Sequence, residues 1–134
     1  MEKDQKDYKY LLKDVIDTHI HTAPDNRPRK FTDIEIASEA AAVGAKAIII
    51  KSHVVPTMDR AYIAEQVVNG IKVFGGIALN NAVGGLNVEA VNNAISMGAK
   101  IVWLPTVDFL LESGITKEQI DVMTKTNASK LLDI

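Results

Sequence analysis

The chain has 134 residues, a formal net charge of −2 at pH 7 and no cysteine. This length suits one domain with a buried core, and the balanced charge gives no reason to expect nucleic acid or an anionic membrane as a partner. Disulfides and thiolate metal sites are excluded, so any metal here has nitrogen and oxygen ligands. Because no apolar run is long enough to span a bilayer or to form a signal core, we expect a cytoplasmic protein.

Apolar runs rich in Ile and Val recur along the chain at residues 15–20, 45–50, 71–78 and 100–104. Near-continuous hydrophobicity predicts strands that are buried on both faces, as in a parallel sheet. The strand starts lie roughly 26–30 residues apart, which is the length of a strand plus a returning helix. We expect Trp103, in the last run, to pack in the core or at an interface.

Helix-start signals fall between these runs. Residues 32–35 form a capping box, and Gly44 is placed to end the helix that follows. Thr57 is predicted to cap a second helix that ends at Val68, and Asn87 is predicted to cap a third.

The alternation of strands and helices predicts an α/β fold of four parallel βα units with right-handed crossovers. A short internal repeat, residues 42–48 against 96–102, supports this prediction. Four such units are half of an eight-stranded (β/α)8 TIM-type barrel, and an open sheet of this kind leaves two unpaired edges.

The pattern changes after the fourth unit. Residues 107–113 are predicted to form a helix or turn, and 116–119 form another capping box that starts a helix to about residue 126. Asn127 is predicted to cap a short terminal helix.

We therefore expect one truncated domain over residues 1–134. It comprises an N-terminal helix or extension (1–14), the four βα units (15–108) and C-terminal helices (109–134).

The sequence Asp-Thr-His-Ile-His at residues 17–21 contains two of the chain's three histidines. Side chains alternate along a strand, so Asp17, His19 and His21 are predicted to share one face, with the two histidines roughly 6–7 Å apart. Histidines on a strand are more often plain polar surface. Two imidazoles on one rigid strand also form two corners of a divalent-metal site, and a carboxylate beside them can orient one ring.

Further polar residues follow the other strands, at the end where parallel α/β folds carry their chemistry. His53 is predicted either to bind the metal or to cap the loop after the second strand. Lys51 either pairs with Asp108 or Asp17, or acts as a general base. Asp108 itself either caps the next helix or binds the metal.

The loop after the first strand is basic. Asp25 precedes Arg27, Arg29 and Lys30, which form either a solvated surface loop or a site for an anionic substrate. Asn80 ends the third strand and is a second candidate for contact with the substrate.

Residues 16–22 resemble the first-strand metal motif of the amidohydrolase-like, metal-dependent hydrolase superfamily, which includes polymerase and histidinol phosphatase (PHP) relatives. The segments that extend the resemblance to an uncharacterised amidohydrolase-like family are 23–25, 27–30, 50–53, 75–77 and 102–108. The resemblance implies a (β/α)8 barrel in which His19 and His21 bind the metal, and it makes His53 a further ligand.

The chain also departs from that family. Full-length members supply more ligands from later strands, whereas this chain has no histidine after His53. Residues 115–132 resemble the end of such barrels, with Ala128 where proline is frequent. The chain thus resembles the first half of a barrel joined to its last helices. Lys51 lies on the second strand and is not assigned the role of the family's carboxylated lysine.

These observations predict a metal-dependent hydrolase that acts on a small polar or anionic molecule through metal-activated water. We expect Zn²⁺, with Mn²⁺ and Fe²⁺ as alternatives. The candidate catalytic residues are Asp108, Lys51 and Asp25; the candidate substrate-binding residues are Arg27, Arg29 and Asn80; the candidate metal ligands are His19, His21, His53 and Asp17.

The alternative function is a non-catalytic half-barrel remnant, or a small metal- or anion-binding module, that acts through oligomerisation. For the hydrolase, we expect a homodimer or a higher homo-oligomer, since a symmetric dimer would close two half barrels into one and cover their open edges. Metal content and oligomeric state separate the two functions.

Overall fold

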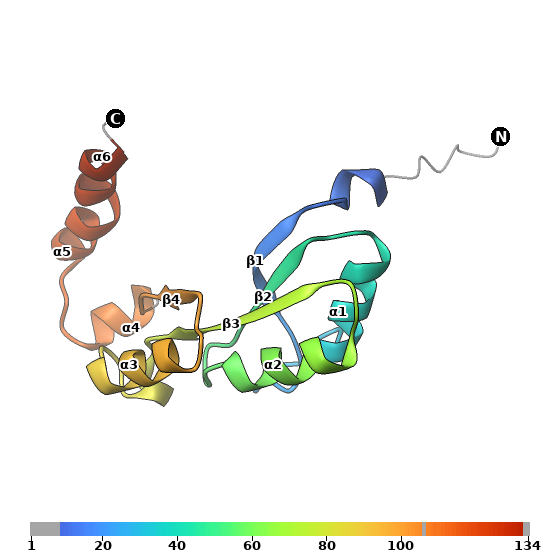
Figure 1. The fold of residues 1–134 in the computed structure, drawn as a ribbon. Helices are drawn as coiled ribbons and strands as arrows, with labels where there is room; N and C mark the ends of the chain where they lie inside the picture. Colours follow the sequence, from blue (N-terminus) through green and yellow to red (C-terminus); the bar gives the residue numbers. More distant parts are fainter. Residues whose placement is uncertain (1–8, 106, 133–134) are drawn as a thin grey trace.

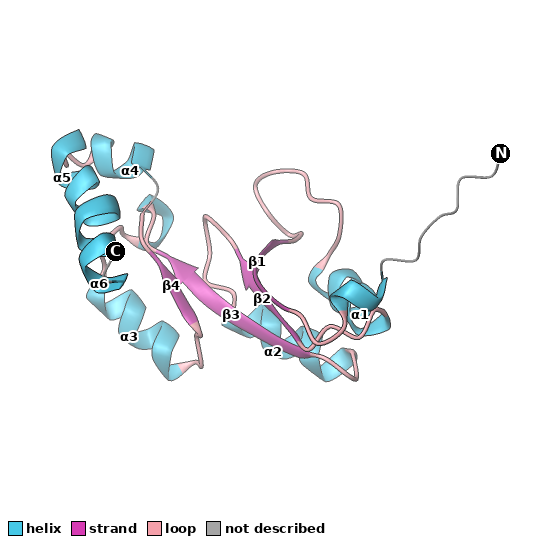
Figure 2. Cartoon of the chain, turned by 90° about the horizontal axis from the view of Figure 1, so that it is seen from above, coloured by secondary structure: helices cyan, strands magenta, loops and turns pink. Residues whose placement is uncertain are grey.

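The structure, a computed structural model, describes residues 9–105 and 107–132. Its strands form one parallel sheet in the order β1-β2-β3-β4 (Figures 1 and 2). Their bounds are β1 Ile16–His21, β2 Ala47–Lys51, β3 Lys72–Ala78 and β4 Ile101–Trp103. Helices alternate with the strands, so the predicted α/β half barrel of four βα units is confirmed.

Three helices return the chain between the strands: α1 (Asp33–Ala42), α2 (Met58–Val67) and α3 (Val88–Ser96). Helices α1 and α2 cover one face of the sheet, where they bury small and branched side chains (Figure 1). This core comprises Ala37, Ala45, Ile48, Ile50, Ala61, Ala64, Ile71 and Val73. A second cluster joins β3 to α3. The face opposite α1 and α2 is called the inner face below.

The predicted caps account for two of these helix starts. Thr32 and Glu35 exchange the two hydrogen bonds of a capping box at α1. The Asn87 side chain accepts a hydrogen bond from the backbone N–H of Ala90 at the start of α3. Each bond satisfies a backbone donor that the first helical turn leaves free.

Thr57 precedes α2, but the prediction that its side chain caps this helix is wrong. Its hydroxyl donates to the Ile50 carbonyl (2.7 Å) and accepts from the Gly76 N–H (3.0 Å). Thr57 is fully buried, and a buried hydroxyl needs such partners. It therefore links the end of β2 to β3 through backbone groups.

Two adjacent glycines, Gly75 and Gly76, allow neighbouring groups to pack closely on both faces of β3. A Cβ built on Gly75 would lie 2.5 Å from the Thr57 backbone, and one on Gly76 would lie 2.6 Å from the Trp103 ring. Any side chain here would displace the start of α2 from one face or Trp103 from the other.

The C-terminal helices contact one another and extend away from the sheet (Figure 1). They are α4 (Val107–Glu112), α5 (Lys117–Asp121), a π-helical segment Val122–Thr126 and α6 (Asn127–Leu132). The capping box at Thr116 is present. Asn127 has helical backbone angles (φ −70°, ψ −36°) and continues the preceding helix, so its predicted role as a cap is wrong.

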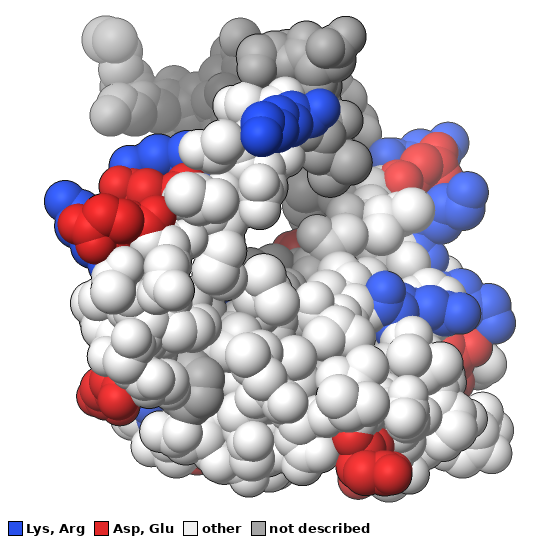
Figure 3. Space-filling view, turned by 90° about the vertical axis from the view of Figure 1, so that its left-hand side faces the viewer, with Lys and Arg blue, Asp and Glu red and all other residues white. Residues whose placement is uncertain are grey.

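Strands β1 and β4 are the edges of the sheet. The side of the molecule that lies on the left in Figure 1 is mainly uncharged, with charged residues toward its margins (Figure 3). Exposed apolar side chains of α3 and β4 include Val88, Ile95 and Val102. Short 3-10 helices occur at Lys9–Leu12 and Asn81–Val83. None of the described helices is long and apolar enough to cross a membrane.

Candidate functional site

A β-bulge shapes the end of β1. Asp17 pairs with Ile48 and Ile20 pairs with Ile50, so three steps along β1 match two steps along β2. The Asp17 carboxylate accepts a hydrogen bond from the backbone N–H of His19 (2.9 Å), across the extra residue. Bulges of this kind occur next to active sites, where they redirect side chains.

The bulge overturns the predicted position of Asp17. The extra residue reverses the alternation, so Asp17 and Ile20 share the helix-covered face, and Asp17 lines a groove with Ile36 of α1. His21, in contrast, is in register with Lys51 and lies on the inner face with it. Asp17 therefore supports the backbone of His19 from the other side of the strand.

His19 and His21, together called the histidine pair, converge through their ring nitrogens. Their Nε2 atoms lie 3.2 Å apart and their ring centroids 5.2 Å apart. One ring nitrogen donates to the other when their tautomers are complementary. Two nitrogens that share one tetrahedral Zn²⁺ at 2.0–2.1 Å would lie about 3.3 Å apart, so the spacing also fits a shared ion.

The environment of His21 favours its neutral form. Burial lowers the pKa of His21 to about 4, with further contributions from the positive charge of Arg29 and from His53, His19 and Lys51. The buried Nδ1 of His21 has no hydrogen-bond partner among the described residues. A neutral imidazole is the form that binds a metal.

His53 lies against the histidine pair through its ring face. Its ring stacks on that of His21, with centroids 4.8 Å apart and 22° between the planes. Asn80 donates to the His53 carbonyl (3.1 Å), so the structure gives Asn80 a role in holding the loop after β2. Within the described residues, no three His, Asp or Glu side chains converge to hold a metal ion.

Lys51 ends β2 in a buried position, with 9% of its surface exposed. Its Nζ lies 5.0 Å from the centroid of the Trp103 ring, which itself lies 6.1 Å from the His19 ring. Burial lowers the pKa of Lys51. No carboxylate among the described side chains pairs with Lys51, and the side chain of Asp108 lies outside them.

Trp103 is a site neighbour that the sequence prediction missed. It was expected in the core or at an interface, and its ring lies near both Lys51 and His19. The signal was Gly76, the β3 residue whose missing side chain leaves room for that ring.

The predicted basic loop contains one buried ion pair. The Nε of Arg29 lies 2.7 Å from Asp25 Oδ2, and the Asp25 side chain is 1% exposed. Burial alone would raise the pKa of Asp25, but hydrogen bonding and charge from Arg29, with the backbone of Asn26 and Arg27, lower it overall. Arg27 is exposed to solvent. The loop thus holds Asp25 and Arg29 close to the histidines and leaves Arg27 at the surface.

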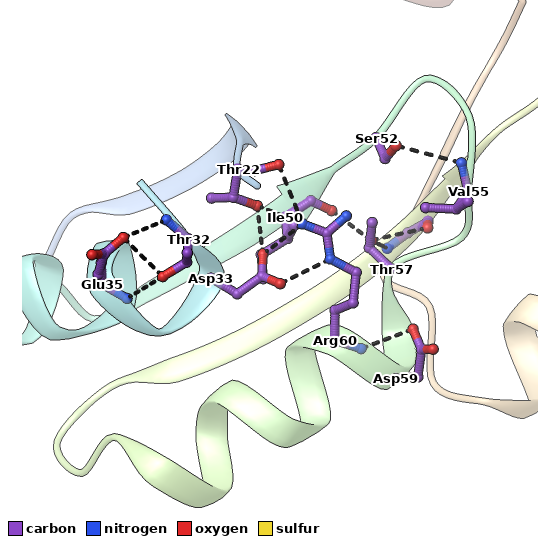
Figure 4. A network of polar contacts seen from close by, with 11 residues as sticks. Thr22, Thr32, Asp33, Glu35, Ile50, Ser52, Val55, Thr57, Asp59 and Arg60 are labelled. Carbon is purple, nitrogen blue, oxygen red and sulfur yellow. Dashed lines mark hydrogen bonds and ion pairs between the residues drawn. The ribbon is translucent and has the colours of Figure 1, made fainter. Parts of the chain in front are cut away.

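A second polar network anchors the residue after His21 (Figure 4). Arg60 of α2 donates from Nε to Asp33 (2.8 Å) and from Nη2 to the hydroxyl (3.1 Å) and carbonyl (3.3 Å) of Thr22. This network, called the Arg60 network, connects the end of β1 with the starts of α1 and α2. The sequence prediction missed it, because nothing in the spacing of Arg60 marks a contact with residues 22 and 33.

Comparison with known proteins places this site within a family. A family model described as a family of unknown function (DUF6282) matches residues 14–130. The chain belongs to this family. The matched span includes all three histidines, the basic loop and Lys51. No curated protein and no solved structure matches the chain.

Proposed function

We propose that this chain binds a divalent metal ion, Zn²⁺ in the first instance, through the histidine pair. We further propose that it is an amidohydrolase-like hydrolase acting on a small polar or anionic molecule. A bound ion would lower the pKa of a coordinated water and polarise a carbonyl or phosphoryl oxygen.

The 3.2 Å separation of the two Nε2 atoms carries the proposal. The backbone of His19 is held at this point, because the bulge begins after Asp17 and the Asp17 carboxylate accepts a hydrogen bond from the His19 N–H. The lowered pKa of His21 supports the proposal further, because metal binding then displaces no proton from this ring at pH 7.

Other residues of the site would position the substrate and the ligands. The stacked ring of His53 fixes one side of His21 and is the nearest candidate for a further ligand. The buried Asp25–Arg29 pair and Lys51 place charged groups beside the rings. Asp108 remains a predicted catalytic residue from the sequence.

Metal content per chain tests the proposal directly. Elemental mass spectrometry on protein purified without chelators should find close to one Zn, Mn or Fe per chain. A His19→Ala/His21→Ala variant should contain no bound metal. Asn92→Ala, which changes an exposed residue on α3, should keep the full metal content. Equal metal content in the wild type and the double variant would overturn the proposal.

A second candidate function is metal or anion binding without hydrolysis. It is favoured by the finding that the described residues bring no third His, Asp or Glu side chain to the histidine pair, since catalytic zinc sites have three protein ligands. Metal-loaded protein that hydrolyses no ester, amide or phosphoester in a broad screen would favour this candidate.

We also propose that two copies associate through their sheet edges. Both β1 and β4 end the sheet, and the exposed side chains of β4 and the neighbouring α3 include the apolar Val88, Ile95 and Val102. Edge strands of this kind are normally covered. Light scattering should give twice the chain mass of 14.6 kDa; the monomer mass at micromolar concentration would contradict association.

A further inference from the structure

The cationic side chains near the histidine pair are a feature that the metal site alone does not explain. Lys51 is the clearest case. Its side chain is on the inner face beside His21, its exposed fraction is 9%, and no described carboxylate balances its charge.

The contact with Trp103 does not compensate for this burial. An ammonium 5.0 Å from a ring centroid gains a cation–π attraction. That attraction is weaker than a direct ion pair with a carboxylate or a bound anion, which is the usual partner of an ammonium on a largely buried side chain. Lys51 is therefore a largely buried side chain whose ammonium has no ion-pair partner among the described residues.

Arg29 presents a second unsatisfied donor. Its Nε is paired with Asp25, but its Nη2 is buried without a partner among the described residues, and Asp25 Oδ1 is unpaired as well. The positive charge of Arg29 contributes to lowering the pKa of both His21 and His53.

The described charges near His53 are mainly positive. Lys51, Arg27 and Arg29 all lower the pKa of His53, and among the described residues Asp25 raises it. A divalent cation on the histidine pair would add two more positive charges. Such an ion binds here more favourably when an anion binds with it, and by linkage the anion then binds more tightly when the ion is present.

We propose that Lys51 and Arg29 together bind an oxyanion, the carboxylate or phosphate group of a small-molecule substrate, next to the histidine pair. This inference rests on the proposed metal site and specifies its substrate class. The metal ion and the oxyanion bind cooperatively, and Lys51 is the main determinant of the coupling because its charge has no carboxylate partner in the described chain.

Calorimetric titration with Co²⁺ tests the coupling. Affinity is measured in chloride, in acetate and in methylphosphonate at equal ionic strength, so that the two anions distinguish a carboxylate from a phosphate preference. We expect the preferred anion to raise the Co²⁺ affinity about tenfold, within the usual range of coupling between sites. The gain should vanish in Lys51→Met.

Lys46→Met is the matched control, because Lys46 is exposed just before the opposite end of β2 and should keep the whole gain. An equal gain in Lys51→Met, or no gain with either anion in the wild type, would overturn the inference.

The same variants separate failure of this inference from failure of the metal site. If Co²⁺ does not bind the wild type at all, the proposed metal site fails. The two anions are then titrated into the metal-free protein, where binding that Lys51→Met abolishes and Lys46→Met retains supports the oxyanion pocket. Absence of binding there overturns the pocket too.

Discussion

Two polar clusters lie at the same end of the sheet and differ in how their groups are satisfied. In the Arg60 network, Nε and Nη2 of Arg60 both have acceptors and Asp33 uses both carboxylate oxygens, while Nη1 of Arg60 is buried without a partner among the described residues (Figure 4). Around the histidine pair, three atoms on three different residues are buried without such partners: His21 Nδ1, Asp25 Oδ1 and Arg29 Nη2. A buried cluster whose charged groups pair with one another stabilises a fold, whereas several unsatisfied groups together at a strand end mark a place where a ligand supplies the missing bonds.

This difference predicts that substitutions in the two clusters have opposite consequences. Changes in the Arg60 network should lower stability strongly, and changes around the histidine pair should affect binding with little loss of stability. Substitutions by methionine or valine test this prediction best, because they remove the polar group and keep most of the side-chain volume.

Arg60→Met should have the largest effect. It leaves Asp33 charged and largely buried without its partner, since the two side chains are 13% and 12% exposed. Loss of one member of a buried pair costs about 3 kcal/mol of unfolding free energy. Urea denaturation of the variant measures it.

The control is Lys72→Met, which breaks the ion pair of Lys72 with Glu65, where Lys72 is 67% exposed. Exposed pairs contribute about 0.5 kcal/mol. Equal losses in the two variants would show that the Arg60 network has no special role in the fold.

Thr57→Val should come next. The substitution keeps the shape and removes the hydroxyl that joins the Ile50 carbonyl to the Gly76 N–H. Two buried backbone groups then lack a side-chain partner, at a cost of about 2 kcal/mol. The thermal midpoint reports the loss, and Ser38→Ala, which removes an exposed hydroxyl that donates to the Ile34 carbonyl of the same helix, should change this midpoint little.

The sequence predicted what depends on local chemistry. Hydrophobic runs gave the four strands, and Thr32, Asn87 and Thr116 gave helix starts, because cap bonds form between residues close in the chain. The role of Thr57 was predicted wrongly because its partners, Ile50 and Gly76, lie on two strands that are distant from it in the chain. Contacts across 7 to 19 residues leave no periodic signal in the sequence.

The histidine pair shows the same limit within one strand. Period-two alternation correctly placed His19 and His21 together but wrongly added Asp17, because a bulge is a mismatch with β2 and does not appear in β1 alone. An Asp two residues before His19, able to accept its N–H, was the available hint.

Stability of the metal-free protein should depend on pH through His21. Its pKa is 6.5 in an unfolded chain and about 4 in the fold. Between these values the unfolded state binds the proton more readily, so stability is complete above pH 6.5 and falls as the pH drops toward 4. Urea midpoints at pH 7 and pH 5, in chelator, measure the fall.

His21→Asn should reduce this fall without abolishing it, because burial also lowers the pKa of His53. The lowered pKa of Asp25 acts only below its ordinary value of 3.8 and does not contribute in this range. If the urea midpoint of His21→Asn falls between pH 7 and pH 5 by as much as that of the wild type, His21 is solvated in both the folded and the unfolded protein.

Lys51→Met should give the smallest change, with the opposite sign to the Arg60 variant. The wild-type Lys51 side chain is largely buried beside Trp103 without a described carboxylate partner, and a methionine would keep the packing against that ring without holding a charge there. The thermal midpoint of the metal-free, anion-free protein should therefore stay the same or rise slightly. A clear decrease in the thermal midpoint would mean that the ammonium stabilises the fold through Trp103. Lys51 would then have a structural role, like the residues of the Arg60 network.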